Sequence, residues 1–239
     1  MKIALIGYGK MGKAIENIAL QNGDEIVLKI NSSNLSDLSV ENIKQADVAI
    51  EFTNPESAAA NIEFCLKNSI PVISGSTGWT DRLESIIELC KEVGGTFLYA
   101  SNFSLGVNIF FEINKRLATL MHNRKEYNVA IEEVHHTAKK DAPSGTAITL
   151  SEQVIKLSEL KNKWGKAEDT DPGTLKISSI RKDPAPGTHH IKYYSDTDDI
   201  EIIHTAHNRN GFAQGAYMAA GFIKDKKGIF SMKDVLDIE

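Results

Sequence analysis

The chain of 239 residues is long enough for one large α/β domain or two modest ones. Its composition, 41% hydrophobic and 25% charged, is that of an ordinary globular protein. A formal net charge of −5 excludes a general attraction to nucleic acid or to an anionic membrane. An anionic ligand would therefore need a local cluster of cations and hydrogen-bond donors.

The first hundred residues alternate the patterns of strands and helices. Short apolar runs that end in glycine or small polar residues are typical of buried parallel strands, and helical periodicity follows several of them. This alternation predicts an α/β fold, a Rossmann-like doubly wound parallel sheet. The expected strands are Ile3–Ile6, Glu25–Ile30, Asp47–Phe52, Pro71–Ser74 and Thr96–Ala100, and the expected helices are Gly12–Gln21, one that Asn54 caps, and Asp81–Val93.

The pattern changes after residue 103 and predicts a smaller α+β domain with a mixed or antiparallel sheet. Long polar loops separate its strand-like segments. A last helix, Gly211–Lys224, is expected to pack back on the first domain. Residues 1–103 and 209–239 would form one domain, and residues 104–208 the other. The second domain is expected to contain helices Leu105–Met121 and Thr146–Leu157 and strands Asn128–Val134, Leu175–Ile180, His189–Tyr194 and Ile200–Ala206.

The cysteines and the N-terminus favour a cytoplasmic protein. Cys65 and Cys90 lie within helical patterns without metal-ligand spacing, so buried reduced thiols are expected. The apolar run Ile3–Ile6 is too short for a signal peptide or a membrane span.

A glycine motif follows the first strand and opens the first helix: Gly7-Tyr8-Gly9-Lys10-Met11-Gly12. In a G-x-G-x-x-G loop the first glycine allows a tight turn, the second lets the backbone approach a pyrophosphate, and the third lets helix and strand pack closely. The N–H groups of the helix N-terminus then face the phosphates. Dinucleotide binding is the favoured interpretation, and a plain glycine turn is the alternative.

The end of the second strand normally indicates the choice of cofactor, because an acid there favours NAD and a nearby cation favours NADP. Here the run 29–34 is Lys-Ile-Asn-Ser-Ser-Asn, without an acid, and Lys29 is expected within the strand. Asn31 and Ser32 could bond a hydroxyl or a phosphate, or belong to a solvated loop. We therefore expect NADPH or NADH as cofactor.

Small and hydroxyl-bearing residues follow the third, fourth and fifth strands. In an open α/β sheet these loops line the ligand crevice, so their residues are expected to pack against nicotinamide and ribose. Ordinary turn chemistry would explain each loop separately. The residues concerned are Phe52, Thr53, Gly75, Ser76, Thr77, Ala100, Ser101, Asn102 and Phe103.

Residues 132–147, E-E-V-H-H-T-A-K-K-D-A-P-S-G-T-A, combine a proton donor, a cation and a helix start rich in N–H and hydroxyl donors. That set suits a small, negatively charged substrate that takes up a proton. Structural histidines, a solvated lysine pair and a plain helix cap are the alternatives. A metal site is not expected, because His135 and His136 would point to opposite faces of a strand. His189 and His190 are expected on a strand surface.

The same runs resemble the signature of the dihydrodipicolinate reductase family. Besides residues 133–147, the resemblance includes the glycine motif and the runs Glu51–Glu56 (E-F-T-N-P-E), Asn102–Asn108 (N-F-S-L-G-V-N) and Phe212–Ala216 (F-A-Q-G-A). It covers nearly the whole chain, and the order and spacing of the runs are highly specific as a set. It implies that His135 is the proton donor and Lys139 the second catalytic residue. It assigns dicarboxylate binding to His136, Lys139, Ser144, Gly145 and Thr146.

The chain also departs from the family pattern. The family's glycine loop often has one more residue. Its Arg-Gly-Gly after the middle strand appears here as Arg181-Lys182-Asp183, followed by Pro184-Ala185-Pro186-Gly187. The second difference concerns the shape of the loop around residues 181–188, not the chemistry. The resemblance further implies a homotetramer assembled through the C-terminal sheets.

The resemblance, together with the glycine motif and residues 132–147, implies a cytoplasmic oxidoreductase that acts on a CH–CH group with NAD or NADP. It would reduce 4-hydroxy-tetrahydrodipicolinate to tetrahydrodipicolinate in the diaminopimelate route of lysine biosynthesis, with no nucleic-acid or membrane partner. Another amino-acid dehydrogenase on a related scaffold is one alternative, and the spacing from His135 to Thr146 argues against it. A non-catalytic nucleotide-sensing module is the other, and it should have lost His135 or Lys139.

Overall fold

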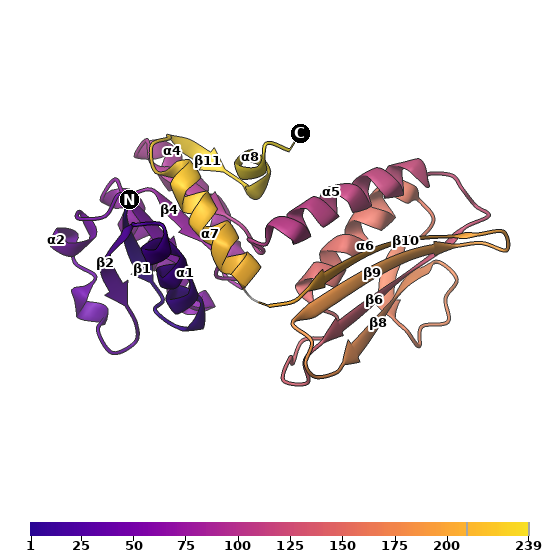
Figure 1. Ribbon diagram of the computed structural model, residues 1–239. Coiled ribbons are helices and arrows are strands. Elements are labelled where there is room, and N and C mark those ends of the chain that lie inside the picture. The colour runs from indigo at the N-terminus through magenta and orange to yellow at the C-terminus, as the bar shows by residue number, and fades with distance from the viewer. Residues whose placement is uncertain (209, 239) are drawn as a thin grey trace. The chain divides into compact units, whose positions relative to one another are not determined.

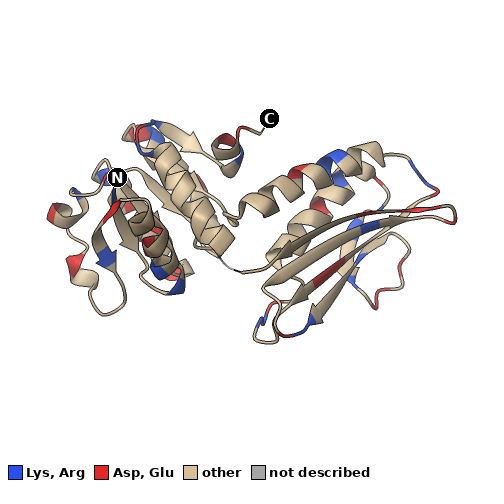
Figure 2. Cartoon of the chain, viewed as in Figure 1, with Lys and Arg blue, Asp and Glu red and all other residues tan. Residues whose placement is uncertain are grey.

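The computed structural model describes residues 1–208 and 210–238, which form two compact units (Figure 1). Residues 1–105 and 210–238 make up the first unit, and residues 106–208 the second. Residues 209 and 239, which the sequence assigns to the first domain, lie outside the described residues. Acidic and basic residues are interspersed along both units (Figure 2).

The first unit contains a six-stranded sheet in the order β11-β5-β4-β3-β1-β2, with every pair parallel. The doubly wound parallel sheet expected from the sequence is therefore confirmed. Its strands are β1 (Lys2–Ile6), β2 (Glu25–Ile30), β3 (Val48–Glu51), β4 (Val72–Ser74), β5 (Thr96–Tyr99) and β11 (Gly228–Phe230). Its helices are α1 (Lys10–Gln21), α2 (Val40–Ile43), α3 (Pro55–Lys67), α4 (Leu83–Glu92), α7 (Asn210–Ile223) and α8 (Met232–Leu236), with 3₁₀ turns at Leu35–Asp37 and Thr80–Arg82.

Apolar side chains alternate along the strands, so each face of the sheet has its own core. Ala4 and Ile6 of β1 point into a cluster with α3 and α4, and Ile3 and Leu5 point into one with α1 and α7. The C-terminal helix α7 thus returns to the first unit, as its sequence predicts. Both cysteines are free and buried in the α3–α4 core.

The second unit contains a five-stranded mixed sheet in the order β10-β9-β6-β8-β7. Strand β9 pairs antiparallel with β10 and β6, whereas β6 and β7 pair parallel with β8. Alternate strand residues and the helices form its core. The strands are β6 (Asn128–His135), β7 (Lys163–Lys166), β8 (Thr174–Arg181), β9 (Gly187–Tyr194) and β10 (Asp199–Ala206), and the helices are α5 (Leu105–Leu120) and α6 (Gly145–Ser158).

Two short strands, β7 and β11, and the short helices were not expected from the sequence. Each is too short to show a period of its own. Within residues 1–208 and 210–238, no helix has both the length and the apolar character needed to cross a membrane.

Candidate active site

The three glycines of the first βα turn have different surroundings. Gly7 adopts φ +102°, and a Cβ on it would lie 2.0 Å from the carbonyl oxygen of Phe52. A Cβ on Gly12 would lie 2.7 Å from the carbonyl oxygen of Gly7, whereas a Cβ on Gly9 would meet nothing within 4 Å. The fold therefore requires the first and third glycines, and the second leaves open space.

The open space lies at the start of α1. The N–H groups of Gly7 and Tyr8 both donate to the carbonyl oxygen of Ile30, at 2.9 and 2.7 Å. Gly9 is the N-cap of α1, and among the described residues no side chain caps that helix. The N–H groups of the first turn, from Lys10 to Gly12, can therefore bind an anion, and the loop fits the pyrophosphate of a dinucleotide.

A pocket of about 320 Å³ lies beside the glycine loop within the first unit. Gly75 needs to be small, because a Cβ there would lie 2.1 Å from the Phe52 ring. The structure thus brings together residues from the loops after β1, β3 and β4. The pocket is lined by Met11, Phe52, Thr53, Asn54, Pro55, Gly75, Ser76 and Thr77.

A buried carboxylate organises these loops. Glu51, the last residue of β3, is 0% exposed. It accepts hydrogen bonds from the Thr53 N–H (2.9 Å), the Ser74 hydroxyl (2.6 Å) and the Ser76 hydroxyl (2.9 Å). Sequence reasoning noted Glu51 only as part of a motif and missed this role.

The residues expected after β5 do not line the pocket. The Phe103 ring is buried in the α1–α7 core, with its centroid 5.6 Å from that of Phe52. The Asn102 carboxamide oxygen accepts from the N–H of Ser104 at 2.9 Å and so shapes the turn. Ala100 and Ser101, which follow the same strand, are half-buried and exposed, respectively.

At the end of β2, Asn31 and Lys29 are both engaged. The Asn31 carboxamide oxygen accepts from the N–H and the hydroxyl of Ser33, at 2.8 and 2.6 Å. Lys29 lies within the strand, as expected, and its Nζ is 2.8 Å from a carboxylate oxygen of Glu16. Glu16 also accepts a hydrogen bond from the Tyr8 hydroxyl. The Lys29 cation is therefore already neutralised.

Strand β6 places Glu133 and His135 on the same buried face of the second sheet, because strand side chains alternate. Glu133 is 0% exposed, and one of its oxygens accepts from the Ser144 N–H (3.0 Å) and from the Arg181 guanidinium (3.1 Å). Burial alone would raise the pKa of Glu133. Hydrogen bonds from His135, Ser144, Ser179 and Arg181 outweigh it and hold that pKa well below its usual value.

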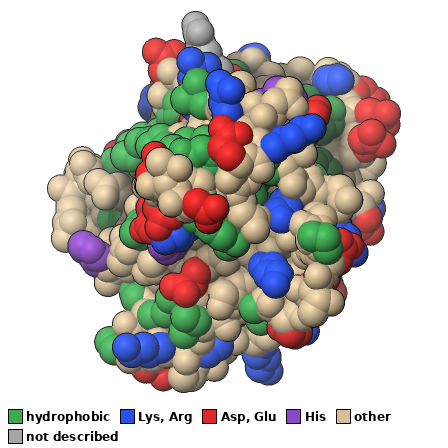
Figure 3. Space-filling model, turned by 90° about the vertical axis from the view of Figure 1, so that its right-hand side faces the viewer, with side chains coloured by type: hydrophobic (Ala, Val, Ile, Leu, Met, Phe, Trp, Pro, Cys, Tyr) green, Lys and Arg blue, Asp and Glu red, His purple; other side chains and the backbone are tan. Residues whose placement is uncertain are grey.

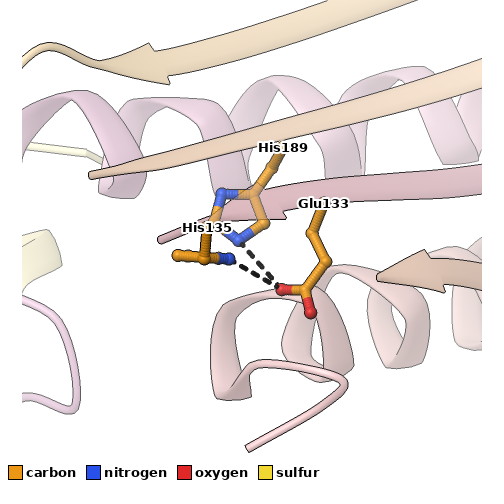
Figure 4. Close-up of side chains that lie close together, drawn as sticks. All are labelled: Glu133, His135 and His189. Carbon is orange, nitrogen blue, oxygen red and sulfur yellow. Dashed lines mark ion pairs between the residues drawn. The ribbon is translucent and has the colours of Figure 1, made fainter. Parts of the chain in front are cut away.

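The other oxygen of Glu133 faces two imidazole rings (Figure 4). Its Oε2 atom is 3.3 Å from Nδ1 of His135 and 3.9 Å from Nε2 of His189. The two rings lie edge to face with centroids 5.2 Å apart. His189 Nε2 is also 3.2 Å from the Ser144 hydroxyl. Burial, with a smaller effect of His135, lowers the pKa of His189 to about 4, so this ring is neutral near pH 7.

The expectation that His189 lies on a strand surface is wrong. His189 is 4% exposed, because β9 pairs with β6 and turns Gly187, His189 and Ile191 toward the buried face. His190 points the other way, and its Nε2 lies 3.1 Å from Glu201. The sequence shows that neighbouring residues of this strand point to opposite faces. It does not show whether His189 or His190 points into the core.

The loop between β6 and α6 carries the remaining predicted residues. Lys139 Nζ lies 2.8 Å from the Asp141 carboxylate, and Arg181 donates to the Asp141 carbonyl oxygen at 2.6 Å. Ser144 is the N-cap of α6 and accepts from the Ala147 N–H, and a Cβ on Gly145 would meet nothing within 4 Å. His136 and Thr146 flank this loop, half-buried. The start of α6, with open space at Gly145, directly follows the loop that carries the Lys139 ammonium.

Glu133, His135 and His189 have the donor types of a metal site, and one ligand atom of each lies within 4.8 Å of the others. The Arg181 guanidinium already neutralises Glu133, which favours a hydrogen-bonded cluster over a metal centre. The absence of a metal remains a prediction.

Glu133 could have been found from its i, i+2 spacing to His135. Arg181 and His189 could not, since their positions depend on strand pairing.

The parallel sheet with an open glycine loop, and a second unit with a buried acid–imidazole cluster, define a two-domain nucleotide-dependent oxidoreductase. Residues 1–103 match the family model for the dihydrodipicolinate reductase N-terminus, and residues 106–236 match the model for its C-terminus. The chain therefore belongs to the dihydrodipicolinate reductase family, the enzymes of the diaminopimelate and lysine route that use NADH or NADPH.

Individual relatives agree with this assignment. The chain is 47% identical to the 4-hydroxy-tetrahydrodipicolinate reductase of Christiangramia forsetii, over 99% of this chain and 98% of the relative. It is 34% identical to the reductase of that name from Alkaliphilus oremlandii, over 96% and 95% of the two chains. None of these findings supports the two alternative functions.

Solved structures share the fold. The dipicolinate-bound dihydrodipicolinate reductase from Paenisporosarcina sp. TG-14 matches with a TM-score of 0.79 and 21% identity, over 97% of both chains. The amine dehydrogenase from Mycobacterium smegmatis matches with a TM-score of 0.63 and 12% identity, over 97% of this chain and 95% of that one. At these identities the likeness concerns the fold alone.

Proposed function

We propose that this chain reduces 4-hydroxy-tetrahydrodipicolinate to tetrahydrodipicolinate, with the cofactor held by residues 1–103 and 209–239 and the substrate by residues 104–208. The observation that carries the proposal is the acid–imidazole cluster on β6 beside the open start of α6. A proton donor, a cation and the positive end of a helix together suit an anionic substrate that takes up hydride and then a proton.

The 4-hydroxy substrate first loses its hydroxyl and a neighbouring ring hydrogen as water, which leaves the unsaturated ring. A bound nicotinamide cofactor would supply hydride for C4 of that ring. His135 donates a proton to the enamine that results. Lys139 neutralises negative charge on the substrate and the charge that develops near His135. Asp141 holds the Lys139 ammonium in the loop at 2.8 Å.

The substrate carboxylates are assigned to the start of α6 and the loop before it. Gly145 leaves room for a carboxylate, and the positive end of the helix attracts it. The Paenisporosarcina relative is bound to dipicolinate, a small dicarboxylate. The proposed substrate-binding residues are His136, Lys139, Ser144, Gly145 and Thr146.

The cofactor is assigned to the glycine loop and the loops at the carboxyl ends of the strands. The pocket beside the glycine loop and the uncapped start of α1 support this assignment. The proposed residues are Gly7, Tyr8, Gly9, Lys10, Met11, Gly12, Asn31, Phe52, Thr53, Gly75, Ser76, Thr77, Ala100, Ser101, Asn102 and Phe103.

The active form is proposed to be a cytoplasmic homotetramer that joins the sheets of the second units. Large hydrophobic side chains are exposed on the strands of that sheet, among them Ile180, Tyr194, Ile200 and Ile203. Burying such side chains against a second copy would be favourable. Figure 3 shows hydrophobic side chains gathered on part of one face, between acidic and basic ones.

The test is steady-state kinetics with substrate generated by the preceding pathway enzyme, with NADH and with NADPH. Because loss of a general acid typically lowers the rate about 10²–10⁴-fold, His135→Gln should lower kcat by that factor and leave the Kd for cofactor unchanged. Lys139→Gln should lower kcat and raise KM. His122→Gln and Lys140→Gln, at exposed positions of the same unit, are the matched controls. Near-parental kcat in both folded active-site variants would refute the assigned roles.

A further inference from the structure

We propose that Glu133 is a positioning residue for the reaction: its carboxylate lies 3.3 Å from Nδ1 of His135, where it can accept a hydrogen bond from Nδ1–H and leave Nε2 to carry the transferable proton. The proposal rests on the proposed role of His135 as the acid. In that step the Nε2–H bond breaks and a C–H bond forms at the substrate carbon, which supplies the electron pair. The ring is left neutral, with its hydrogen on Nδ1.

His135 Nδ1 and Glu133 Oε2 are close neighbours, and neither is bonded to another group of the described residues. His135 Nδ1 and Glu133 Oε2 are 3.3 Å apart, and both are buried. Among the described residues neither atom has a hydrogen-bond partner in this structure. Because a buried polar group without a partner is costly, a hydrogen bond between these two neighbouring atoms would be favourable.

The carboxylate itself is fixed in place. The Ser144 N–H and the Arg181 guanidinium occupy Oε1, which leaves Oε2 to the imidazole. Arg181 stands opposite His135 in the parallel pairing of β8 with β6, so its charge reaches Glu133 from the neighbouring strand. A carboxylate held by a guanidinium stays ionised and accepts from the ring at every stage of the reaction.

The other edge of the ring is left uncovered. A Cβ on Gly187 would lie 3.0 Å from Nε2 of His135, so the missing side chain at this position leaves space beside that atom. An acceptor behind one ring nitrogen fixes the tautomer and directs the other nitrogen toward the substrate.

Other charged groups surround the pair without replacing Glu133. Arg181 faces it from β8 and His189 from β9, while Lys139 and Asp141 lie in the loop after β6. His189 Nε2 is closer to the Ser144 hydroxyl, at 3.2 Å, than to Glu133 Oε2, at 3.9 Å. Glu133 is therefore the carboxylate that controls the hydrogen on His135 Nδ1.

The first experiment is the kinetics of Glu133→Gln, which keeps the volume and removes the charge. Loss of the partner behind a metal-bound imidazole typically costs about 10–100-fold, and we expect a fall in kcat of the same order here. KM and the cofactor Kd should change less than about threefold. The high-pH limb of the kcat profile should move to lower pH, because the imidazolium loses its anion. Glu133→Asp, which keeps the charge, should restore part of kcat and of the profile.

The matched control is Glu201→Gln. Glu201 also pairs with an imidazole, since its carboxylate lies 3.1 Å from His190 Nε2, but the pair is partly exposed and lies away from the cluster. The kcat and the pH profile of Glu201→Gln should equal those of the parent. Size-exclusion chromatography and circular dichroism would verify assembly and folding of each variant.

A second experiment needs no change to Glu133. Nitrogen-15 spectra of the full chain, with the His135 signals assigned by difference from His135→Gln, report which ring nitrogen carries the hydrogen. The hydrogen should be on Nδ1 in the neutral form. Finding it on Nε2, or finding parental kcat and pH profile in folded Glu133→Gln, would overturn the proposal. If His135→Gln itself kept its kcat, the proposed function would fail instead.

Discussion

Two buried glutamates, one in each unit, stand at or near the carboxyl end of a strand and have opposite kinds of partner. Glu51 at the end of β3 accepts from the Thr53 N–H and from the hydroxyls of Ser74 and Ser76. Glu133 on β6 faces a guanidinium and two imidazoles. Both are 0% exposed, so burial does not distinguish them.

The difference lies in whether the partners titrate. Hydroxyl and N–H donors keep the same charge across the working pH range, so Glu51 fixes the shape of the loops that line a pocket. An imidazole that donates a proton changes charge in the proposed reaction, so Glu133 couples the shape of its site to proton transfer. A site that holds a cofactor needs the first kind of carboxylate, and a site that moves a proton needs the second.

The largest effect is expected from a side chain that fills the open space at Gly9 in the first unit. Gly9→Val should fold, because a Cβ there meets nothing within 4 Å, and should abolish cofactor binding, because the side chain fills the pyrophosphate position. Gly145→Val fills the equally open start of α6 and should raise KM for substrate while leaving the cofactor Kd unchanged. Fluorescence titration with NADH and NADPH separates the two. Unchanged cofactor binding in Gly9→Val would remove the basis for the cofactor assignment.

The second unit should lose stability in mild acid, because His189 is buried there as a neutral ring. The folded pKa of His189, about 4, lies below the ordinary value of 6.5, so the unfolded chain takes up the proton first. The contribution is complete above about pH 6.5 and falls by about 3 kcal/mol as the pH drops toward 4.

Urea unfolding of the parent and of His189→Gln over this pH range measures that contribution. The variant should show the flatter dependence. An equal slope in both proteins would mean that another group causes the acid sensitivity.

A smaller effect is expected at the cofactor loop after β2. The parent should use NADH and NADPH with kcat/KM within about tenfold, or roughly 1.4 kcal/mol, because Asn31 neither repels nor strongly attracts a phosphate. Glu16→Gln releases Lys29 from its ion pair and should shift preference toward NADPH. Asn31→Asp should shift it toward NADH by charge repulsion. A parental preference above a hundredfold would contradict this interpretation of the loop.

The smallest effect is expected at the start of α6. Thr146→Val keeps the shape and removes the hydroxyl, so KM should rise a few-fold while kcat stays parental, if the hydroxyl binds ground state and transition state equally. Thr137→Val is a control in the same loop, since its hydroxyl is bonded to Asp183. A fall in kcat equal to the fall in kcat/KM would place Thr146 in the transition state.

Much of the fold could be predicted because its strands carry continuous apolar runs or strict alternation. Strand β7, Lys-Trp-Gly-Lys, has neither and forms only because β8 offers a free edge. His135 and Lys139 could be proposed from local sequence, since both lie in one run. Arg181 and His189 lie more than forty residues beyond Glu133, and only the strand register brings them to it. Pairing between strands that are distant in the chain cannot be inferred from the local sequence pattern.

The parallel pairing of β6 with β8 has a consequence for insertions and deletions. His135 pairs with Arg181 at the last rung of this ladder, and β9 resumes pairing with β6 at Thr188. Residues 182–186 lie outside both ladders, but the Lys182 N–H donates to the His135 carbonyl oxygen at 2.8 Å and Asp183 accepts from the Thr137 N–H. A change of length confined to residues 184–186 would leave the pairing of Arg181 and His189 in place. One residue added inside β8 would instead turn Arg181 to the opposite face and leave Glu133 without its cation. An insertion or deletion should therefore be tolerated better in residues 184–186 than inside β8.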